Sequence, residues 1–244
     1  MTGPRPKAAQ LADHLLRHHH GPGSLATICR AALQTPCSVG LALAADAALA
    51  RRISLCGDGP LADAGETLQI NLGEGPCVQA LQQRATVLAD DLADPGVVRL
   101  FPLFAHQARA RGIRAVLALP APPRSRAPER GGLVLCLYRD RPGPLPLADR
   151  HTAADHLGAA LLLLQAACTA EGRPPPVRLP EPQALLHQAV GVICYHHAVS
   201  VDQALDLLRS HAFSHGMDLG DLARAVVRDD LRLPGETGTE PTQP

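Results

Sequence analysis

A proline-rich segment at residues 171–182, EGRPPPVRLPEP, constrains the fold of this chain more than any other feature. It stands between two stretches with helical spacing, and proline removes a backbone donor and disfavours helix at the residue before it. The segment is therefore predicted to be a semi-rigid, extended linker. It divides the 244 residues into a larger unit, about 8–170, and a smaller unit, 183–233, followed by a tail at 234–244 that is expected to be disordered.

Composition narrows the possible classes of protein. The 23 Lys and Arg residues balance 23 Asp and Glu, so a nucleic-acid partner would need a local positive patch. The seven cysteines include no Cys-x-x-Cys pair, which argues against a zinc or dithiol motif and favours reduced thiols. The most apolar run, 157–168, is shorter than the ~20 residues that span a bilayer, and the N-terminus does not resemble a secretory signal. We expect a soluble cytoplasmic protein without a metal or other cofactor.

The larger unit mixes strand patterns with helical patterns. Helical spacing of apolar residues covers 8–15 and 25–32, and two further helices begin with proline, at 76–83 and 102–111. Short strand patterns occupy 39–43, 51–56, 86–89, 113–119 and 133–138. The loop at 120–132, rich in Pro and Arg, joins the last two strands as a hairpin. This mixture predicts an α+β fold, a sheet with flanking helices.

The helix predicted over 147–170 carries a narrow apolar seam. Its members are spaced by three and four residues: Ala154, Leu157, Leu161, Leu164 and Cys168. This spacing is typical of a two-helix coiled coil and predicts a homodimer through this helix. The alternative is a helix packed on the sheet of its own chain, and about two heptads do not decide between them.

Three helical patterns fill the smaller unit and predict a three-helix bundle. The first begins with Pro182 in its first turn. The second begins with Ser200 and Gln203, a capping-box arrangement, and Gly216 is placed to end it. The third begins near Asp218.

Motifs in both units resemble known families. Four motifs of the smaller unit resemble the ANTAR domain: Gln188-Ala189-x-Gly191-Val192-Ile193, Ser200-x-Asp202-x-Ala204, Leu208-Arg209-x-x-Ala212 and Leu219-x-x-Leu222-Ala223. Four segments of the larger unit resemble the GAF domain: GEGPC at 73–77, LADDLADP at 88–95, FPLF at 101–104 and GIRAVLALP at 112–120. The chain thus resembles GAF-ANTAR regulators of the actinobacterial type. The resemblance implies an RNA-binding module behind a domain that senses a small molecule.

Six residues of the smaller unit are candidates for RNA contact: Gln188, Gly191, Tyr195, His197, Arg209 and Arg224. Gln188, Gly191 and Arg209 match the family motifs. Arg209 suits a phosphate or a loop base, although an ion pair with Asp206 or Asp202 is the alternative. Tyr195 can stack on an unpaired base or cover the edge of the core. His197, like His196, ends a helix, where capping of the dipole competes with RNA contact.

Charge argues for a rival function. Residues 183–233 hold four Arg against six Asp, a formal charge of −2, and Val190 stands where ANTAR sequences often have Lys. Phosphate neutralisation supplies much of the affinity for RNA. The rival is therefore a degenerate module that binds another protein. A third possibility is that Arg124, Arg126 and Arg130, in the predicted hairpin loop, supply the missing positive charge.

Cys77 is the candidate for a ligand or redox site. It follows Pro76 at a predicted helix start, where free N–H groups can lower a thiol pKa. The alternative is a small buried residue behind the turn at Gly73 to Gly75. No Gly-x-Ser-x-Gly or His-Glu-x-x-His motif occurs, so an enzyme is not expected.

The main hypothesis is a cytoplasmic, dimeric, signal-responsive regulator whose bundle binds paired RNA hairpins in a nascent transcript and acts by transcription antitermination. A continuous helix transmits rotation between domains, whereas the predicted linker does not. Regulation by proximity or masking is therefore expected. The identity of the small-molecule signal is not encoded in any motif of the sequence.

Overall fold

The computed structural model describes residues 7–18, 24–44, 52–122, 132–171, 181–229 and 231–233, with side chains from 167 to 171 outside the description. Its contacts divide the chain into two compact units, Met1–Val177 and Arg178–Pro244. Most of the predicted linker and the whole predicted tail lie outside the described residues. So do Arg124, Arg126 and Arg130.

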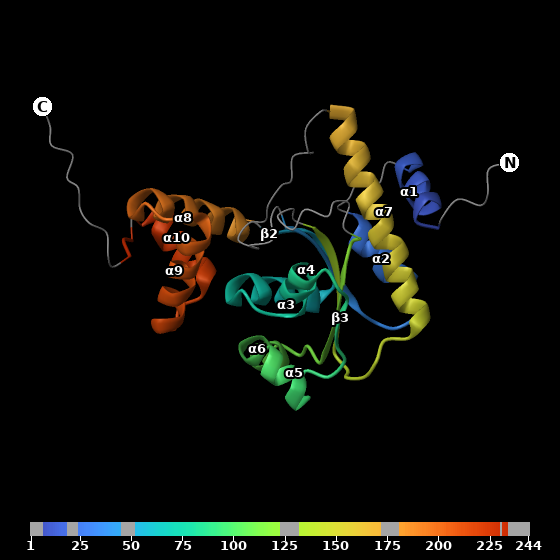
Figure 1. Ribbon diagram of the computed structural model, residues 1–244, viewed down its shortest axis with the longest axis horizontal. Coiled ribbons are helices and arrows are strands. Elements are labelled where there is room, and N and C mark those ends of the chain that lie inside the picture. The colour runs from blue at the N-terminus through green and yellow to red at the C-terminus, as the bar shows by residue number, and fades with distance from the viewer. Residues whose placement is uncertain are drawn as a thin grey trace, which may run out of the picture. The chain divides into compact units, whose positions relative to one another are not determined.

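The first unit is built on a five-stranded antiparallel sheet (Figure 1). Its strands are β1 (Ser38–Ala44), β2 (Arg52–Asp58), β3 (Val87–Ala89), β4 (Ala115–Pro120) and β5 (Leu133–Arg139), in the spatial order β2-β1-β5-β4-β3. Strands β4 and β5 pair as the predicted hairpin, with Ala115 opposite Arg139 and Pro120 opposite Val134. The predicted α+β class is confirmed.

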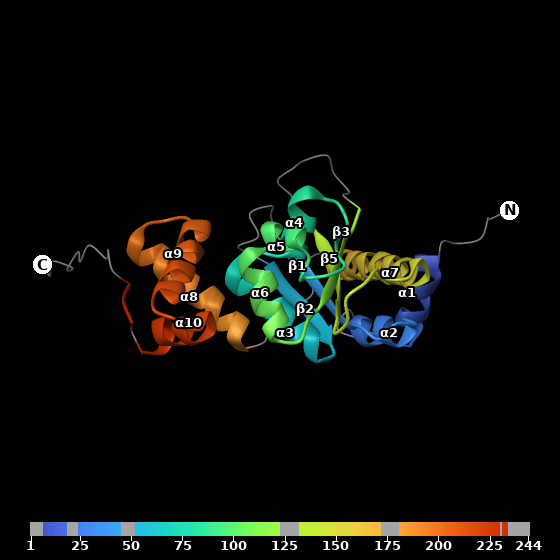
Figure 2. The same cartoon turned by 90° about the horizontal axis from the view of Figure 1, so that it is seen from below.

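Helices cover both faces of this sheet (Figures 1 and 2). One face carries α1 (Lys7–Arg17), α2 (Leu25–Ala32) and α7 (Leu147–Glu171). The other carries α3 (Pro60–Leu72), α4 (Pro76–Gln83) and α6 (Pro102–Ala110), with α5 (Pro95–Leu100) beside α6. Successive residues of a strand point to opposite faces, so β5 feeds both cores. Leu133, Leu135 and Leu137 face α2 and α7, whereas Val134, Cys136 and Tyr138 face α3 and α4.

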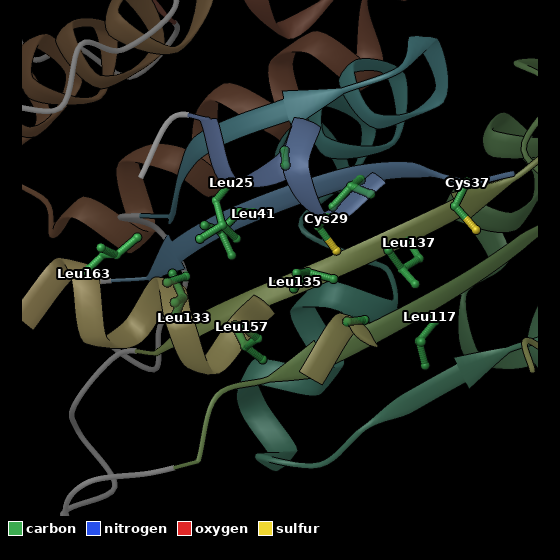
Figure 3. Close-up of a cluster of buried hydrophobic side chains, with 14 of the residues drawn as sticks. Leu25, Cys29, Cys37, Leu41, Leu117, Leu133, Leu135, Leu137, Leu157 and Leu163 are labelled. Atoms are coloured by element: carbon green, nitrogen blue, oxygen red, sulfur yellow. The ribbon is translucent and has the colours of Figure 1, made fainter. Parts of the chain in front are cut away.

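Helix α7 packs on the sheet of its own chain. Leu157 and Leu163 are 4% and 3% exposed and lie in one core with Leu133 and Leu135 of β5 (Figure 3). The apolar stripe of α7 is therefore buried by the sheet. A stripe of this kind can pack against any apolar surface of matching width, and a second helix is not required.

The predicted seam therefore packs largely on the chain's own sheet, which was the alternative interpretation, and the side chain of its last member, Cys168, lies outside the described residues. Leu161 and Leu164 pack against the same core, and Ala154 is exposed. Helix α1 takes a further part of the α7 surface, since a Cβ at Gly158 would lie 2.9 Å from the Ala8 methyl group. Homodimerisation stays a prediction without this seam as its support.

The sequence patterns do not predict two helices, α3 and α5. Helix α3 buries Gly65, Glu66 and Gln69 alongside Ala62 and Leu68. Polar residues at core positions interrupt the apolar stripe by which a helix is recognised.

The second unit is a three-helix bundle of α8 (Glu181–His197), α9 (Val201–Ser214) and α10 (Leu219–Arg228). The capping box at the start of α9 is confirmed: Gln203 N–H donates to Ser200 Oγ at 3.3 Å, and Ser200 N–H donates to Gln203 Oε1 at 2.9 Å. Asp218 caps α10 by accepting from Gly220 N–H at 2.8 Å. The core is apolar throughout: Leu185, Ala189, Ile193, Ala204, Leu205, Leu208, Leu222, Ala223 and Val226.

Candidate functional site

Three of the predicted RNA-contact residues lie on one exposed face of α8. Gln188, Gly191 and Tyr195 follow one another at spacings of three and four, which places them on the same side of a helix. All three are exposed, and Tyr195 keeps 84% of its surface accessible. Opposite them, Ala189 and Ile193 are fully buried. We call this set of three the α8 face.

The α8 face is flat in its middle and polar at one end. A Cβ built on Gly191 would meet no described atom within 4 Å apart from the adjoining backbone of its own helix, so a planar group can approach the helix there. The Gln188 amide offers donors and an acceptor, and the Tyr195 ring offers a π surface. These are the groups that hold a splayed base by hydrogen bonding and stacking.

Comparison with the other aromatic side chains of the protein shows that the exposure of Tyr195 is unusual. The chain has three Phe and two Tyr and no Trp. Phe101, Phe104 and Tyr138 of the first unit are 3%, 0% and 0% exposed, whereas Tyr195 and Phe213 of the second are 84% and 73% exposed. Aromatic side chains contribute most to stability when buried. Tyr195 therefore does not cover the core edge, which was the alternative interpretation.

His197 does not join the α8 face. It is half-buried with its Nε2 atom enclosed, and it lies about 200° around the helix from Tyr195. His196 is exposed, and its ring meets the Tyr195 ring edge-on with centroids 5.3 Å apart. Of the two histidines, His196 thus extends the aromatic surface next to Tyr195.

Arg209 adopts the ion pair that was its alternative role. Its Nη1 lies 3.5 Å from Asp206 Oδ1, one helical turn away, and its side chain is 22% exposed. Burial lowers the pKa of the Arg209 guanidinium, partly offset by Asp206 and Asp202. The positive charge of Arg209 is thus partly compensated by neighbouring carboxylates.

Two other arginines of the bundle also lie against carboxylates. Arg224 Nη1 donates to Asp221 Oδ1 at 2.7 Å, and Arg228 Nη2 donates to Glu181 Oε1 at 2.6 Å. Val190, at the position where ANTAR sequences often carry Lys, is 5% exposed and belongs to the core. The described bundle therefore offers little uncompensated positive charge to a phosphate.

Cys77 lies in a buried polar network of the first unit. Its N–H donates to Gln69 Oε1 at 2.7 Å, and Gln69 Nε2 donates to the Tyr138 hydroxyl oxygen at 2.8 Å. The Tyr138 hydroxyl in turn donates to Glu66 Oε1 at 2.6 Å, and Glu66 also pairs with Arg52. The turn before Cys77 is confirmed, since Gly73 and Gly75 have φ of +64° and +138°.

Burial favours the structural role of Cys77. Its side chain is fully buried, whereas a reactive cysteine must be accessible. Burial, with a hydrogen bond to Cys77, raises the pKa of the neighbouring Cys136 thiol well above its ordinary value. Among the described residues, no group of three or more His, Cys, Asp or Glu side chains could hold a metal ion.

The second unit is thus a small helical module with an exposed, partly aromatic face on α8. Residues 180–227 match the ANTAR domain, and the chain carries an ANTAR domain in this segment. That domain implies the family of RNA-binding antitermination regulators of transcription. No curated protein matches the chain. No helix in the described part of the chain is long and apolar enough to cross a membrane.

Several solved structures are distantly similar in fold. The free methionine-R-sulfoxide reductase of Neisseria meningitidis, in complex with its substrate, covers 70% of this chain and 97% of its own, at 16% identity and a TM-score of 0.43. A GAF domain/HD domain protein from Geobacter sulfurreducens covers 64% and 92%, at 16% identity and 0.38. A GAF domain of a phosphoenolpyruvate-protein phosphotransferase from Coxiella burnetii covers 68% and 96%, at 12% identity and 0.38. Likeness at this level assigns no activity to this chain.

The sequence patterns missed two features of the surface. Phe213 is exposed near the end of α9, close in sequence to the stacked rings of His211 and His215, whose centroids are 4.0 Å apart. A surface pocket beside α2 in the first unit has no motif of its own. The shared face of Gln188, Gly191 and Tyr195 follows from their spacing and could have been found from the sequence.

Proposed function

We propose that this protein is a signal-responsive regulator that binds hairpins in nascent transcripts and acts by transcription antitermination. In this proposal the α8 face contacts unpaired loop bases, with Tyr195 stacking, Gln188 hydrogen-bonding and Gly191 allowing close approach. The observation that carries the proposal is the exposure of these three residues on one side of α8, within the ANTAR match. The first unit, which resembles GAF domains, senses the signal, and the chain acts in the cytoplasm.

Stacking rather than charge supplies the affinity in this proposal. The three arginines of α9 and α10 each lie against a carboxylate, and residues 183–233 carry a formal charge of −2. Each neutralised phosphate adds about −0.7 to −0.9 to the slope of log K against log salt. With fewer than about three phosphates neutralised, that slope is expected to be shallower than about −3.

The first test is a gel-shift titration of the full chain with tandem RNA hairpins at low and high salt. Tyr195→Ala is expected to weaken binding by roughly 5- to 150-fold, because base–aromatic stacking is worth about 1–3 kcal/mol. Phe213→Ala is the matched control, since it removes an aromatic side chain of similar exposure from another helix. Equal losses in both variants would show that the α8 face is not the contact.

Gly191→Ala separates binding from folding. Alanine in the helix interior is expected to stabilise the second unit by about 0.5–1 kcal/mol, since its methyl group would clash with no described neighbour outside the adjoining helix backbone. The same methyl group lifts a base away from the backbone and is expected to weaken RNA binding. A variant that is more stable and binds RNA as well as the parent chain would contradict the role given to Gly191.

A specific observation favours a second candidate, a module that binds a protein partner. The carboxylates of Asp206, Asp221 and Glu181 remain exposed around the arginines that they contact, which disfavours an RNA backbone. Absence of an RNA complex even at low salt would support this candidate and reject the first.

Regulation is the remaining part of the proposal. A signal must bind one arrangement of the protein more tightly than another in order to change its activity. We expect the proline-rich residues 171–182 to tether the units, so that the signal acts through proximity or masking. A homodimer remains part of this proposal, and sedimentation of the full chain tests it.

A further inference from the structure

A pocket of about 660 Å³ opens in the first unit where strand β1 begins and strands β2 and β5 end. Helix α2, the segment 33–37 and the start of α3 complete its walls, and we call it the α2 pocket. Its volume falls in the range of about 300–1,000 Å³ that is usual for small-molecule sites. All of its walls belong to the first unit, so it is separate from the α8 face.

The walls of the α2 pocket are held in place by their own hydrogen bonds. Asp149, in the first turn of α7 and 1% exposed, accepts from the N–H groups of Gln34 and Thr35 at 2.8 and 3.0 Å. Where β1 and α3 line the pocket, Ser38 Oγ accepts from Leu61 N–H at 3.3 Å. A site with such walls is largely formed before any ligand arrives, which lowers the entropic cost of binding.

One carboxylate in the pocket is already hydrogen-bonded to neighbouring side chains. Arg30 Nη1 donates to Asp58 Oδ1 at 2.7 Å. A hydrogen bond from the Thr27 hydroxyl, together with Arg30, lowers the pKa of Asp58. Asp58 therefore stays ionised and fixes the position of Arg30 at the pocket wall.

Two side chains of the lining keep hydrogen-bonding capacity for a ligand. Arg30 has five N–H donors, and its side chain is 47% exposed beside Asp58. Asp140, after the end of β5, is an exposed carboxylate of the same lining. An arginine with N–H donors beyond the one that Asp58 accepts, and an exposed carboxylate in the same lining, match a ligand that carries both a carboxylate and an ammonium group.

We infer that the α2 pocket binds a small zwitterion, a free α-amino acid. Its carboxylate meets the Arg30 guanidinium, its ammonium meets the Asp140 carboxylate, and its side chain lies over Leu33 and Leu61. Through Asp149 the same wall is bonded to α7, the last helix of the first unit. Amino-acid binding at this pocket does not depend on the proposed function. Only the idea that the bound amino acid is the signal rests on it.

Isothermal titration calorimetry of the full chain against a panel of free L-amino acids tests the inference. At least one amino acid is expected to bind at a single site, and its amide and N-acetyl derivatives, which each lack one charge, to bind at least tenfold more weakly. Arg30→Gln and Asp140→Asn are expected to cause losses of about 10- to 150-fold, since charged hydrogen bonds are worth about 1.5–3 kcal/mol. Arg228→Gln, which removes an exposed arginine of the second unit, is the control and leaves binding unchanged.

Three outcomes would overturn the inference. They are no saturable heat with any amino acid, a derivative that binds as tightly as its parent, and Arg30→Gln and Asp140→Asn variants that fold and bind normally. Gel shifts with and without the bound amino acid then test the signal separately. Amino-acid binding in a protein that binds no RNA refutes the proposed function and leaves this site intact.

Discussion

Glu66 and Arg52 form an ion pair inside the first unit, with side chains only 4% and 3% exposed. Burial opposes the charge on Arg52, but nearby Cys77, Glu66 and Tyr138 hold its pKa above the ordinary value. Within the described structure its Nε and Nη1 atoms have no hydrogen-bond partner. Arg52 therefore depends on Glu66 for its compensation in the core.

Glu66→Gln keeps the shape of the side chain and an acceptor for Tyr138 but removes the negative charge. Loss of one partner of a buried pair costs about 3–5 kcal/mol, because the other charge is left uncompensated. At an m value of about 2 kcal/mol/M, that loss lowers the urea midpoint of the first unit by roughly 2 M. Urea titrations followed by circular dichroism measure the shift.

The matched control is Glu181→Gln, which breaks the exposed pair between Glu181 and Arg228. Those side chains are 66% and 54% exposed, and exposed pairs contribute about 0–1 kcal/mol. The double variant Arg52→Met with Glu66→Leu removes both charges and is expected to recover the loss except for about 1–3 kcal/mol, the cost of leaving the Tyr138 hydroxyl without its acceptor. Similar small losses for Glu66→Gln and Glu181→Gln would refute the reasoning.

Three further changes have defined outcomes. Gly65→Ala places a Cβ 2.2 Å from the Tyr138 ring and is expected to destabilise the first unit by about 1–3 kcal/mol or prevent its folding, measured by urea titration. Ser200→Ala removes half of a capping box and is expected to cost the second unit about 1 kcal/mol, read from its thermal midpoint. Burial tends to raise the pKa of Asp149, but hydrogen bonds from Thr35 and Gln34 lower it overall, so its stabilising contribution is lost as the pH falls through that lowered value. Unfolding free energies between about pH 7 and 3 should therefore fall less steeply for Asp149→Asn than for the parent chain.

Local chemistry predicted much of the architecture. Proline in the first turn marks α4 and α6, and Ser200 with Gln203 marks α9, because these signals act within four residues. Helix α3 also begins with a proline, Pro60, but it escaped prediction because Glu66 and Gln69 at core positions interrupt its apolar stripe. Gly65 is required by the ring of Tyr138, which lies 73 positions further along the chain.

Side-chain partners could be predicted only where they were local. The Asp206 partner of Arg209 lies three residues away and was one of two expected roles. The partner surface of α7 could not be read from its spacing, because a sheet and a second helix both satisfy an apolar stripe. The burial of Val190 could not be predicted either, because it depends on how the three helices pack in the core of the bundle.

The exposure of Tyr195 gives the chain its own optical reporter. Because the sequence lacks tryptophan, ultraviolet emission comes from two tyrosines, one in each unit. Tyr138 is enclosed and Tyr195 is open to solvent, so iodide should quench only the second. Partner binding at α8 and unfolding of the sheet can thus be followed in one unlabelled sample.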